Sequence, residues 1–237
     1  MRLSIFSTLL FFAGNSFAQR TVDVTKQDVN FQNSSFFYVV NGSPVSLVKY
    51  VKVVDGSPFF GDDWMKARII LSLGKEYDNL LVKLDLLANE LYYKDASGHE
   101  MVATSTLQQV VLIDTVKSLF YTFVYSDAIP FAGNPPDKGW YQVMTNGKAI
   151  LYKQFVKTIN EVKPYGSATV EQTIYTTSNF FVLYNDRFTR IKKFKDLTDL
   201  LADKKTLLQQ YITAGKLNGK KEDDYISVVT YYNDLFQ

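Results

Sequence analysis

The chain has 237 residues, of which 46% are hydrophobic and 21% are charged, enough for one sizeable core or at most two small ones. Its 26 basic and 24 acidic residues give a formal net charge of +2, which argues against a nucleic-acid-binding protein because such proteins carry a strong basic excess. The absence of cysteine and the single histidine exclude disulfides, thiol nucleophiles, thiolate metal sites and multi-histidine metal clusters.

The first residues have the pattern of a secretory signal peptide. Arg2 precedes an apolar run over residues 3–13, and the small-x-small tripeptide Ser16–Ala18 follows. We therefore expect residues 1–18 to be a signal peptide that is cleaved between Ala18 and Gln19. The alternative is a membrane anchor, but the run is much shorter than the roughly 20 residues that span a bilayer. This pattern predicts an exported protein of the periplasm, the cell surface or the extracellular space, with no transmembrane segment in the mature chain.

Residues 31–193 read as short strands separated by turns, because Tyr, Phe, Val, Ile and Thr dominate there. Apolar residues alternate with others at positions 69–73, 82–86 and 119–125. A period of two indicates antiparallel sheets with one buried face, and the chain shows no strand–helix–strand rhythm of a parallel α/β fold. We expect one or more antiparallel sheets that form a sandwich or an open barrel.

Three turns divide this region into hairpins. Asn146-Gly147 lies between Trp140–Thr145 and Lys148–Ile159, and Asn-Gly predicts a tight type I′ turn. Asn185-Asp186 predicts a second hairpin, and a turn at Ala88-Asn89 predicts that the chain returns beside the strand before it.

Residues 126–139 hold three of the six prolines, at positions 130, 135 and 136. The strand character on both sides of this segment is the same. We therefore interpret it as a long loop within one domain over residues 19–237, with a linker between two small domains as the alternative.

Residues 196–236 change to a helical period. Asp203 is expected to cap a helix over residues 204–214, and Gly215 suits the position after its end. The last segment carries an apolar stripe that acidic residues 222–224 precede, as the helix dipole favours. The stripe consists of Tyr225, Val228, Val229, Tyr232, Leu235 and Phe236. We expect it to pack on the sheet, with association with a partner as the alternative, so the predicted fold class is α+β, mainly β, with C-terminal helices packed on the sheet.

No residue pattern of a common catalytic or metal site is present. His99 lies in a turn over residues 95–100, next to Glu100, which would point elsewhere on a strand, so we interpret it as a solvated turn histidine. Neither Asp62-Asp63 nor the acidic residues 222–224 have the spacing of a calcium loop. The sequence has no Gly-rich phosphate loop, nucleophile elbow or His-Glu-x-x-His motif. We therefore predict no catalytic residue, metal ligand or cofactor.

Aromatic residues make up 15% of the chain. They suit either a platform that stacks on a sugar or lines a lipid groove, or simply the core of a β protein, and we favour the core. The candidates for binding are Trp64, in a loop, and Trp140 with its neighbour Tyr141, directly after the proline-rich segment.

Three stretches together resemble a known family: residues 55–64 (DGSPFFGDDW), residues 139–159 around Asn146-Gly147-Lys148, and residues 220–235. The combination is similar to uncharacterised exported proteins of Gram-negative bacteria of gut and soil type. The resemblance implies a location in the cell envelope, and it implies no activity and no site residue.

These observations favour a non-enzymatic envelope protein that acts by binding or scaffolding, with a protein of the envelope or an apolar ligand as its partner. One alternative is a carrier or sensor that encloses an apolar, lipid-like ligand in a curved sheet, for which a continuous apolar cavity is the mark. A second is a hydrolase with an unrecognised pair of carboxylates, for which two facing acids in a cleft are the mark.

Overall fold

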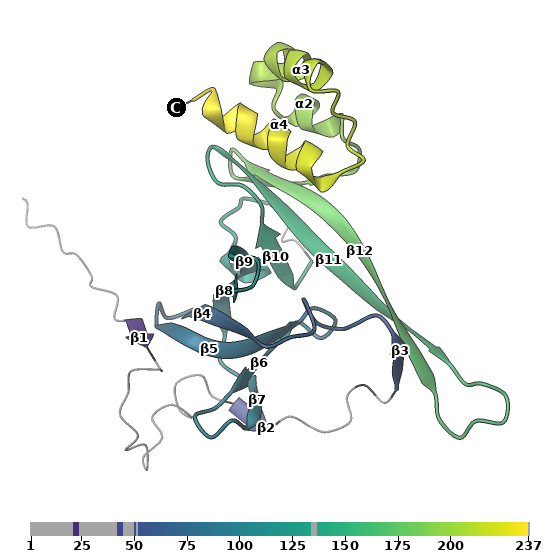
Figure 1. Cartoon of the computed structure of the whole chain (residues 1–237). Coiled ribbons are helices and arrows are strands. Elements are labelled where there is room, and N and C mark those ends of the chain that lie inside the picture. Colours follow the sequence, from purple (N-terminus) through teal and green to yellow (C-terminus); the bar gives the residue numbers. More distant parts are fainter. Residues whose placement is uncertain (1–20, 24–41, 45–49, 51, 134–136, 237) are drawn as a thin grey trace, which may run out of the picture.

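The computed structural model describes residues 21–23, 42–44, 50, 52–133 and 137–236 (Figure 1). The expected signal peptide and its cleavage site at Ala18 and Gln19 lie outside these residues, as do residues 31–41 of the expected β region. Within the described part of the chain, no helix has both the length and the apolar character needed to cross a membrane.

The described chain is mainly β, and its α-helices follow the last strand. The strands are β1 (Thr21–Asp23), β2 (Gly42–Pro44), β3 (Val53–Asp55), β4 (Met65–Leu71), β5 (Glu76–Asp85), β6 (Glu90–Lys94), β7 (Glu100–Ala103), β8 (Leu107–Asp114), β9 (Leu119–Tyr125), β10 (Trp140–Val143), β11 (Ala149–Val162), β12 (Glu171–Tyr184) and β13 (Arg187–Ile191). The helices are α2 (Asp196–Leu200), α3 (Lys205–Ala214) and α4 (Glu222–Asp234), with short 3₁₀ helices η1 (Ser126–Ala128) and η2 (Ala202–Lys204).

All the strands belong to one 13-stranded sheet in the order β13-β12-β11-β10-β9-β8-β4-β5-β6-β7-β2. Neighbours in this path are antiparallel, which confirms the predicted fold class. The remaining two strands depart from the predicted antiparallel pairing, because β1 pairs in parallel with β5 and β3 pairs in parallel with β12. Each of them occupies a stretch of edge that a shorter neighbour leaves open: β6 pairs with residues 82–85 of β5, and β1 pairs with residues 76–78.

Of the hairpin turns predicted at Asn185-Asp186 and at Asn146-Gly147, the structure confirms only the first. Asn185 and Asp186 both have positive φ, 48° and 59°, as a type I′ turn requires, and Tyr184 lies opposite Arg187, so this hairpin is confirmed. At the other turn only Gly147 has positive φ. A two-residue turn there would place Val143 opposite residue 150, whereas Val143 lies opposite Tyr152. The predicted tight turn is therefore wrong, and its place is taken by a wider loop that the side chain of Asn233 fills.

A smaller error concerns the end of β4. The alternation predicted that Leu73 continues the strand, but β4 ends at Leu71, and Leu73 is 87% exposed in the turn before β5. Gly74, with φ of 74°, supplies the left-handed residue of that turn.

The buried side chains form three clusters. The first is formed by the strands β4–β10 and includes Ile69, Leu84, Phe123 and Trp140. The second joins β11–β13 to the helices, and the third contains Tyr141 with Tyr152 of β11 and Phe181 of β12. Because Trp140 and Tyr141 are neighbours on one strand and belong to different clusters, β10 is buried on both faces.

The helices pack against the β11–β12 hairpin at the start of β11 and the end of β12, as predicted (Figure 1). Val228, Val229 and Tyr232 of the predicted stripe are fully buried in the second cluster. Asp203 does not cap α3 as expected: both of its carboxylate oxygens accept a hydrogen bond from the Tyr232 hydroxyl at 3.1 Å. This bond ties the turn before α3 to the last turn of α4.

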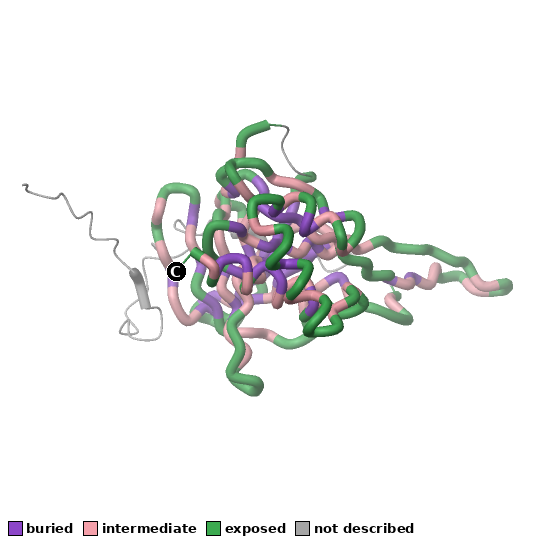
Figure 2. The backbone as a smooth tube through the Cα atoms, turned by 90° about the horizontal axis from the view of Figure 1, so that it is seen from above, coloured by how far each residue is buried: buried purple, intermediate pink, exposed green. Residues whose placement is uncertain are grey.

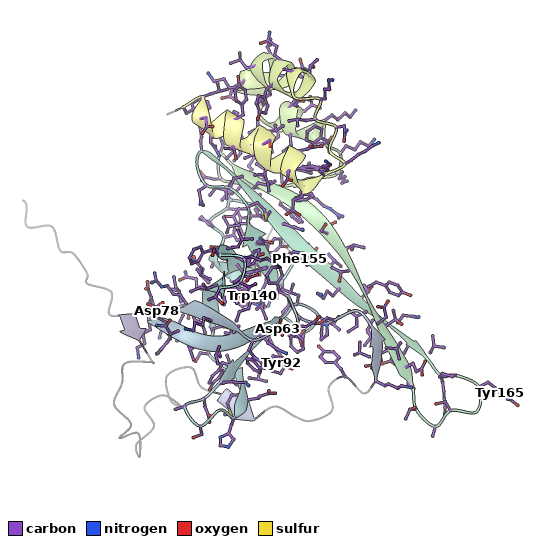
Figure 3. The ribbon with its side chains drawn as sticks, in the orientation of Figure 1. Asp63, Asp78, Tyr92, Trp140, Phe155 and Tyr165 are labelled. Carbon is purple, nitrogen blue, oxygen red and sulfur yellow. The ribbon has the colours of Figure 1, made fainter. Side chains whose placement is uncertain are left out.

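The outer half of the β11–β12 hairpin projects away from the rest of the molecule (Figures 1 and 2). Both strands have 14 residues, well above the mean strand length of about 5–6. Residues 158–162 of β11 are exposed, and Tyr165 lies at the far end of the hairpin (Figure 3).

Candidate functional site

A pocket of about 210 Å³ opens at the start of β10, beside the first core cluster. Its wall comes from the β5–β6 turn, the β7–β8 connection and the adjoining ends of β9 and β10. The lining residues are Asn89, Glu90, Leu91, Ala103, Ser105, Thr106, Leu107, Tyr125 and Trp140.

Strand pairing places the two aromatic residues of the pocket side by side. Trp140, the first residue of β10, lies opposite Tyr125, the last residue of β9. Their rings meet edge to face, with centroids 5.2 Å apart and an interplanar angle of 76°, an arrangement that aromatic quadrupoles favour. The indole position is therefore set by backbone register and by ring packing together.

The indole Nε1 of Trp140 is a buried donor without an acceptor among the described residues. The residue is only 2% exposed, and Figure 3 shows it at the centre of the molecule. A buried donor without a partner costs about 1–3 kcal/mol, so native structures retain few such groups. Trp140 thus lines the pocket and carries a buried polar group for which the described residues offer no partner.

The other polar groups of the pocket wall are mainly neutral. Asn89, Ser105 and Thr106 carry amide and hydroxyl groups that both donate and accept hydrogen bonds. Burial, and then the charge of Asp127, raises the pKa of the Tyr125 hydroxyl, so this group remains neutral at physiological pH.

Glu90 is the one carboxylate in the pocket wall. It shares a hydrogen bond with Tyr92, whose pKa is raised to about 12 by burial, then by the charges of Asp85 and Glu90 and by that hydrogen bond. The negative charge of Glu90 makes the pocket unfavourable for anions, while its oxygens accept hydrogen bonds from hydroxyl groups.

The structure does not bring the three aromatic candidates from the sequence together. Trp140 lines the pocket, but it is buried rather than exposed as expected, because its side of β10 faces the first core cluster. Tyr141 is on the opposite face, fully buried, and its hydroxyl donates to the Asp137 carbonyl at 2.9 Å. Trp64 is half-buried outside the pocket, with the Lys94 and Lys83 ammonium groups 4.8 and 5.5 Å from its ring.

His99 lies in the β6–β7 turn as predicted and its side chain is 75% exposed. Its imidazole is oriented by Asp95, whose Oδ2 lies 3.1 Å from Nδ1. Sequence reasoning considered only Glu100 for this role and missed Asp95. The other oxygen of Asp95 accepts the backbone N–H groups of Ser97 and His99, so this carboxylate closes the turn.

The acidic clusters singled out in the sequence lie in a loop and at the start of a helix. Asp62 and Asp63 lie on an exposed loop. Glu222 forms an ion pair with Lys153, and Asp224 accepts the N–H groups of Asn218 and Gly219 at the start of α4. The described residues contain no group of three or more His, Asp or Glu side chains that could hold a metal ion.

Asp85 is a fully buried carboxylate that the sequence did not distinguish from the other acids. One of its oxygens accepts the N–H groups of Leu87 and Ala88, and the other accepts the Tyr50 hydroxyl at 2.6 Å. Burial, followed by this hydrogen bond, raises the pKa of Tyr50. The donors around Asp85 compensate its burial and tie the β5–β6 turn in place.

The residues of the pocket carried no common signal in the sequence. Asn89 could be read only as a turn residue, and Ser105 and Thr106 only as part of a loop. The pocket arises because β9 and β10 pair across the long 126–139 segment, which places Tyr125 and Trp140 together.

Comparisons of the chain with protein-family models, with curated proteins and with solved structures gave no match.

Proposed function

We propose that this protein is an exported, non-enzymatic binding module of the bacterial envelope, and that the pocket beside Trp140 binds a small neutral hydroxylated ligand of monosaccharide size. The observation that carries the proposal is that Trp140, which lines that pocket, has a buried N–H without an acceptor among the described residues. The leader-like residues 1–18 and the resemblance to exported Gram-negative proteins support the location.

A hydroxylated ligand suits the groups in the pocket wall. Its oxygens can accept hydrogen bonds from donors such as the Trp140 N–H, and its hydroxyls can donate to Glu90 and Asn89. Side chains cover Nε1, so an acceptor reaches it only when residues of the pocket wall move slightly. Rotamer changes of this size are common on binding.

The alternative functions fit this pocket less well. A lipid-like ligand prefers a long apolar cavity, whereas this pocket measures about 210 Å³ and has several polar residues in its wall. A carboxylate-based hydrolase needs two acids that face the scissile bond, and the pocket wall contributes one, Glu90.

Ligand screening with the purified protein tests the proposal. Isothermal titration with neutral mono- and disaccharides, sugar acids and fatty acids should show saturable binding within the neutral group. Ser105→Leu places an apolar side chain in the pocket wall and should weaken that binding at least about tenfold, a change of about 1.4 kcal/mol.

Ser97→Leu, in the exposed β6–β7 turn, is the matched control and should bind as the wild type does. Saturable binding of fatty acids alone would support the carrier instead. Equal weakening by both serine variants, or no binding in any group, would contradict the proposed site.

A further inference from the structure

The outer half of β11 has one open edge. On one side β11 pairs with β12 along its whole length, from Ala149 to Val162. On the other side it pairs with β10 only at residues 152–154. Beyond Gln154, that side of β11 has no strand partner in the part of the chain that the structure describes. Open edges of this kind are templates for pairing with another strand.

The backbone groups of odd-numbered residues point toward this edge. In an antiparallel sheet, hydrogen bonding alternates between the two sides of a strand from residue to residue. On the β10 side, the Leu151 carbonyl accepts the Met144 N–H, and the Ala149 N–H donates to Asn233. The pairing of β11 with β12 continues without a register shift. The N–H and C=O groups of Lys157, Ile159 and Glu161 therefore face outward.

The open stretch of β11 covers residues 156–162, and its bounds define a midpoint. It begins after Phe155, which packs against the core residues Phe60 and Phe123. It ends at Val162, shortly before Pro164, which has no N–H to donate. The midpoint of residues 156–162 is Ile159, which is 39% exposed although it is apolar.

Two copies of this stretch are complementary when they pair antiparallel about Ile159. Ile159 then faces the partner's Ile159, and Val156 faces the partner's Val162. Lys157 faces the partner's Glu161, so the two-fold axis generates this opposite-charge pair twice. Apolar and opposite-charge pairs directly across a sheet are stabilising.

The neighbouring registers lack this complementarity. Outward-facing residues must lie opposite outward-facing residues, which leaves centres at whole residues only. Centring on Lys157 or on Glu161 places like charges face to face. Centring on residue 160 places Lys157 opposite the partner's Lys163, and centring on residue 158 places Lys157 opposite the partner's Ile159.

We propose that two copies of this chain form a two-fold dimer by antiparallel pairing of their β11 edges, centred on Ile159. The interface is isologous, because the same patch serves both subunits. It covers exposed apolar side chains of the projecting hairpin, and it extends the sheet from one subunit into the other. The open edge is thereby occupied in a defined register rather than left available for aggregation.

Charge reversal tests this register in the full purified protein. Sedimentation equilibrium should show a dimer for the wild type. Glu161→Lys should raise the dimer dissociation constant at least about tenfold, because Lys157 then faces a lysine in both symmetric positions. Lys157→Glu should have the same effect through two facing glutamates. An equimolar mixture of the two variants should dimerise as the wild type does, since both charge pairs are restored in the heterodimer.

A second substitution covers the case in which Lys157→Glu fails to fold, since the Lys157 ammonium also donates to the Ser57 carbonyl. Ile159→Asp places two carboxylates at the axis and should produce monomers. Tyr175→Asp, on the exposed part of the neighbouring strand β12, is its matched control and should remain dimeric. A wild type that is monomeric up to about 1 mM, or a dimer that withstands Glu161→Lys and Ile159→Asp, would overturn the proposal.

Discussion

The side chain of Asn233 in α4 takes the position of a strand partner for Ala149. Its Oδ1 accepts the Ala149 N–H at 2.8 Å, and its Nδ2 donates to the Ala149 carbonyl at 2.8 Å and to the Asn146 carbonyl at 3.0 Å. In the two-residue turn predicted from the sequence, Thr145 and Lys148 would instead hydrogen-bond to each other. The helix thus supplies both the donor and the acceptor that the start of β11 needs, and it couples the last helix to the sheet through polar contacts as well as apolar ones.

Replacing Asn233 with Ala should lower the free energy of unfolding by at least about 1–3 kcal/mol, because the buried backbone groups of Ala149 lose their partners. Denaturant unfolding of the purified variant measures this loss. Asp234→Ala, at the exposed neighbouring position, should change stability by less than about 0.5 kcal/mol. Equal stability of both variants would show that the carboxamide contributes nothing.

Gly147 and Asn233 should be energetically coupled. A Cβ at Gly147 would lie 2.5 Å from the Asn233 Cγ, and the glycine has φ of 136°. Gly147→Ala should therefore destabilise the protein, both through backbone strain and by displacing the carboxamide. The Gly147→Ala, Asn233→Ala double variant should lose less free energy of unfolding than the sum of the losses in the two single variants. Losses that simply add would contradict the coupling.

Two adjacent leucines of α3 test how the helices contribute to stability. Leu208 is fully buried in the second core cluster, and Leu207 is 39% exposed. Leu208→Ala should cost about 2–5 kcal/mol, since it leaves a cavity between helix and sheet. Leu207→Ala should cost about 0.5 kcal/mol or less. Thermal or denaturant unfolding distinguishes the two, and similar costs would mean that the helices do not share the core.

Stability should fall at alkaline pH in a way that depends on Tyr92. Its pKa is raised from 10.0 to about 12 in the folded protein, first by burial. Above about pH 10 the unfolded chain loses this proton while the folded protein keeps it, so the free energy of unfolding falls as the pH rises. Two pKa units set an upper limit of about 3 kcal/mol on this loss between about pH 10 and 12, and solvent screening of the hydroxyl makes the loss smaller.

Urea unfolding at a series of pH values checks this effect. Tyr92→Phe should flatten the decline above about pH 10, while Tyr165→Phe, at the far end of the projecting hairpin (Figure 3), should keep the decline of the wild type. An unchanged slope in Tyr92→Phe would show that this hydroxyl is not responsible.

Local sequence patterns predicted much of the fold, because alternation and helical period reflect which face of a strand or helix is buried. Alternation placed Val82 and Leu84 in the core, and the period of the last segment placed Val228 and Val229 against the sheet. The wide loop at Asn146-Gly147 was mispredicted, because a residue more than eighty positions away fills it. The residues around this turn give no indication that the Asn233 carboxamide lies there.

The candidate site was less predictable than the fold. Trp140 was singled out as a rare, large aromatic residue after a proline-rich segment, yet it was expected to be exposed. Its burial follows from the pairing of β10 between β9 and β11, a property of the whole sheet. Ser105 and Asn89 join it only through strand order, which no spacing along the chain encodes.

The nuclear magnetic resonance signal of the Trp140 indole N–H tests the proposed binding site most directly. The chain has two tryptophans, so a ¹⁵N-labelled protein should show two indole cross-peaks, and Trp64→Phe assigns the one that remains to Trp140. On titration with a neutral sugar that binds, the Trp140 cross-peak should shift in a saturable way while that of Trp64 stays in place. A Trp140 cross-peak that does not move at saturation would contradict binding in this pocket.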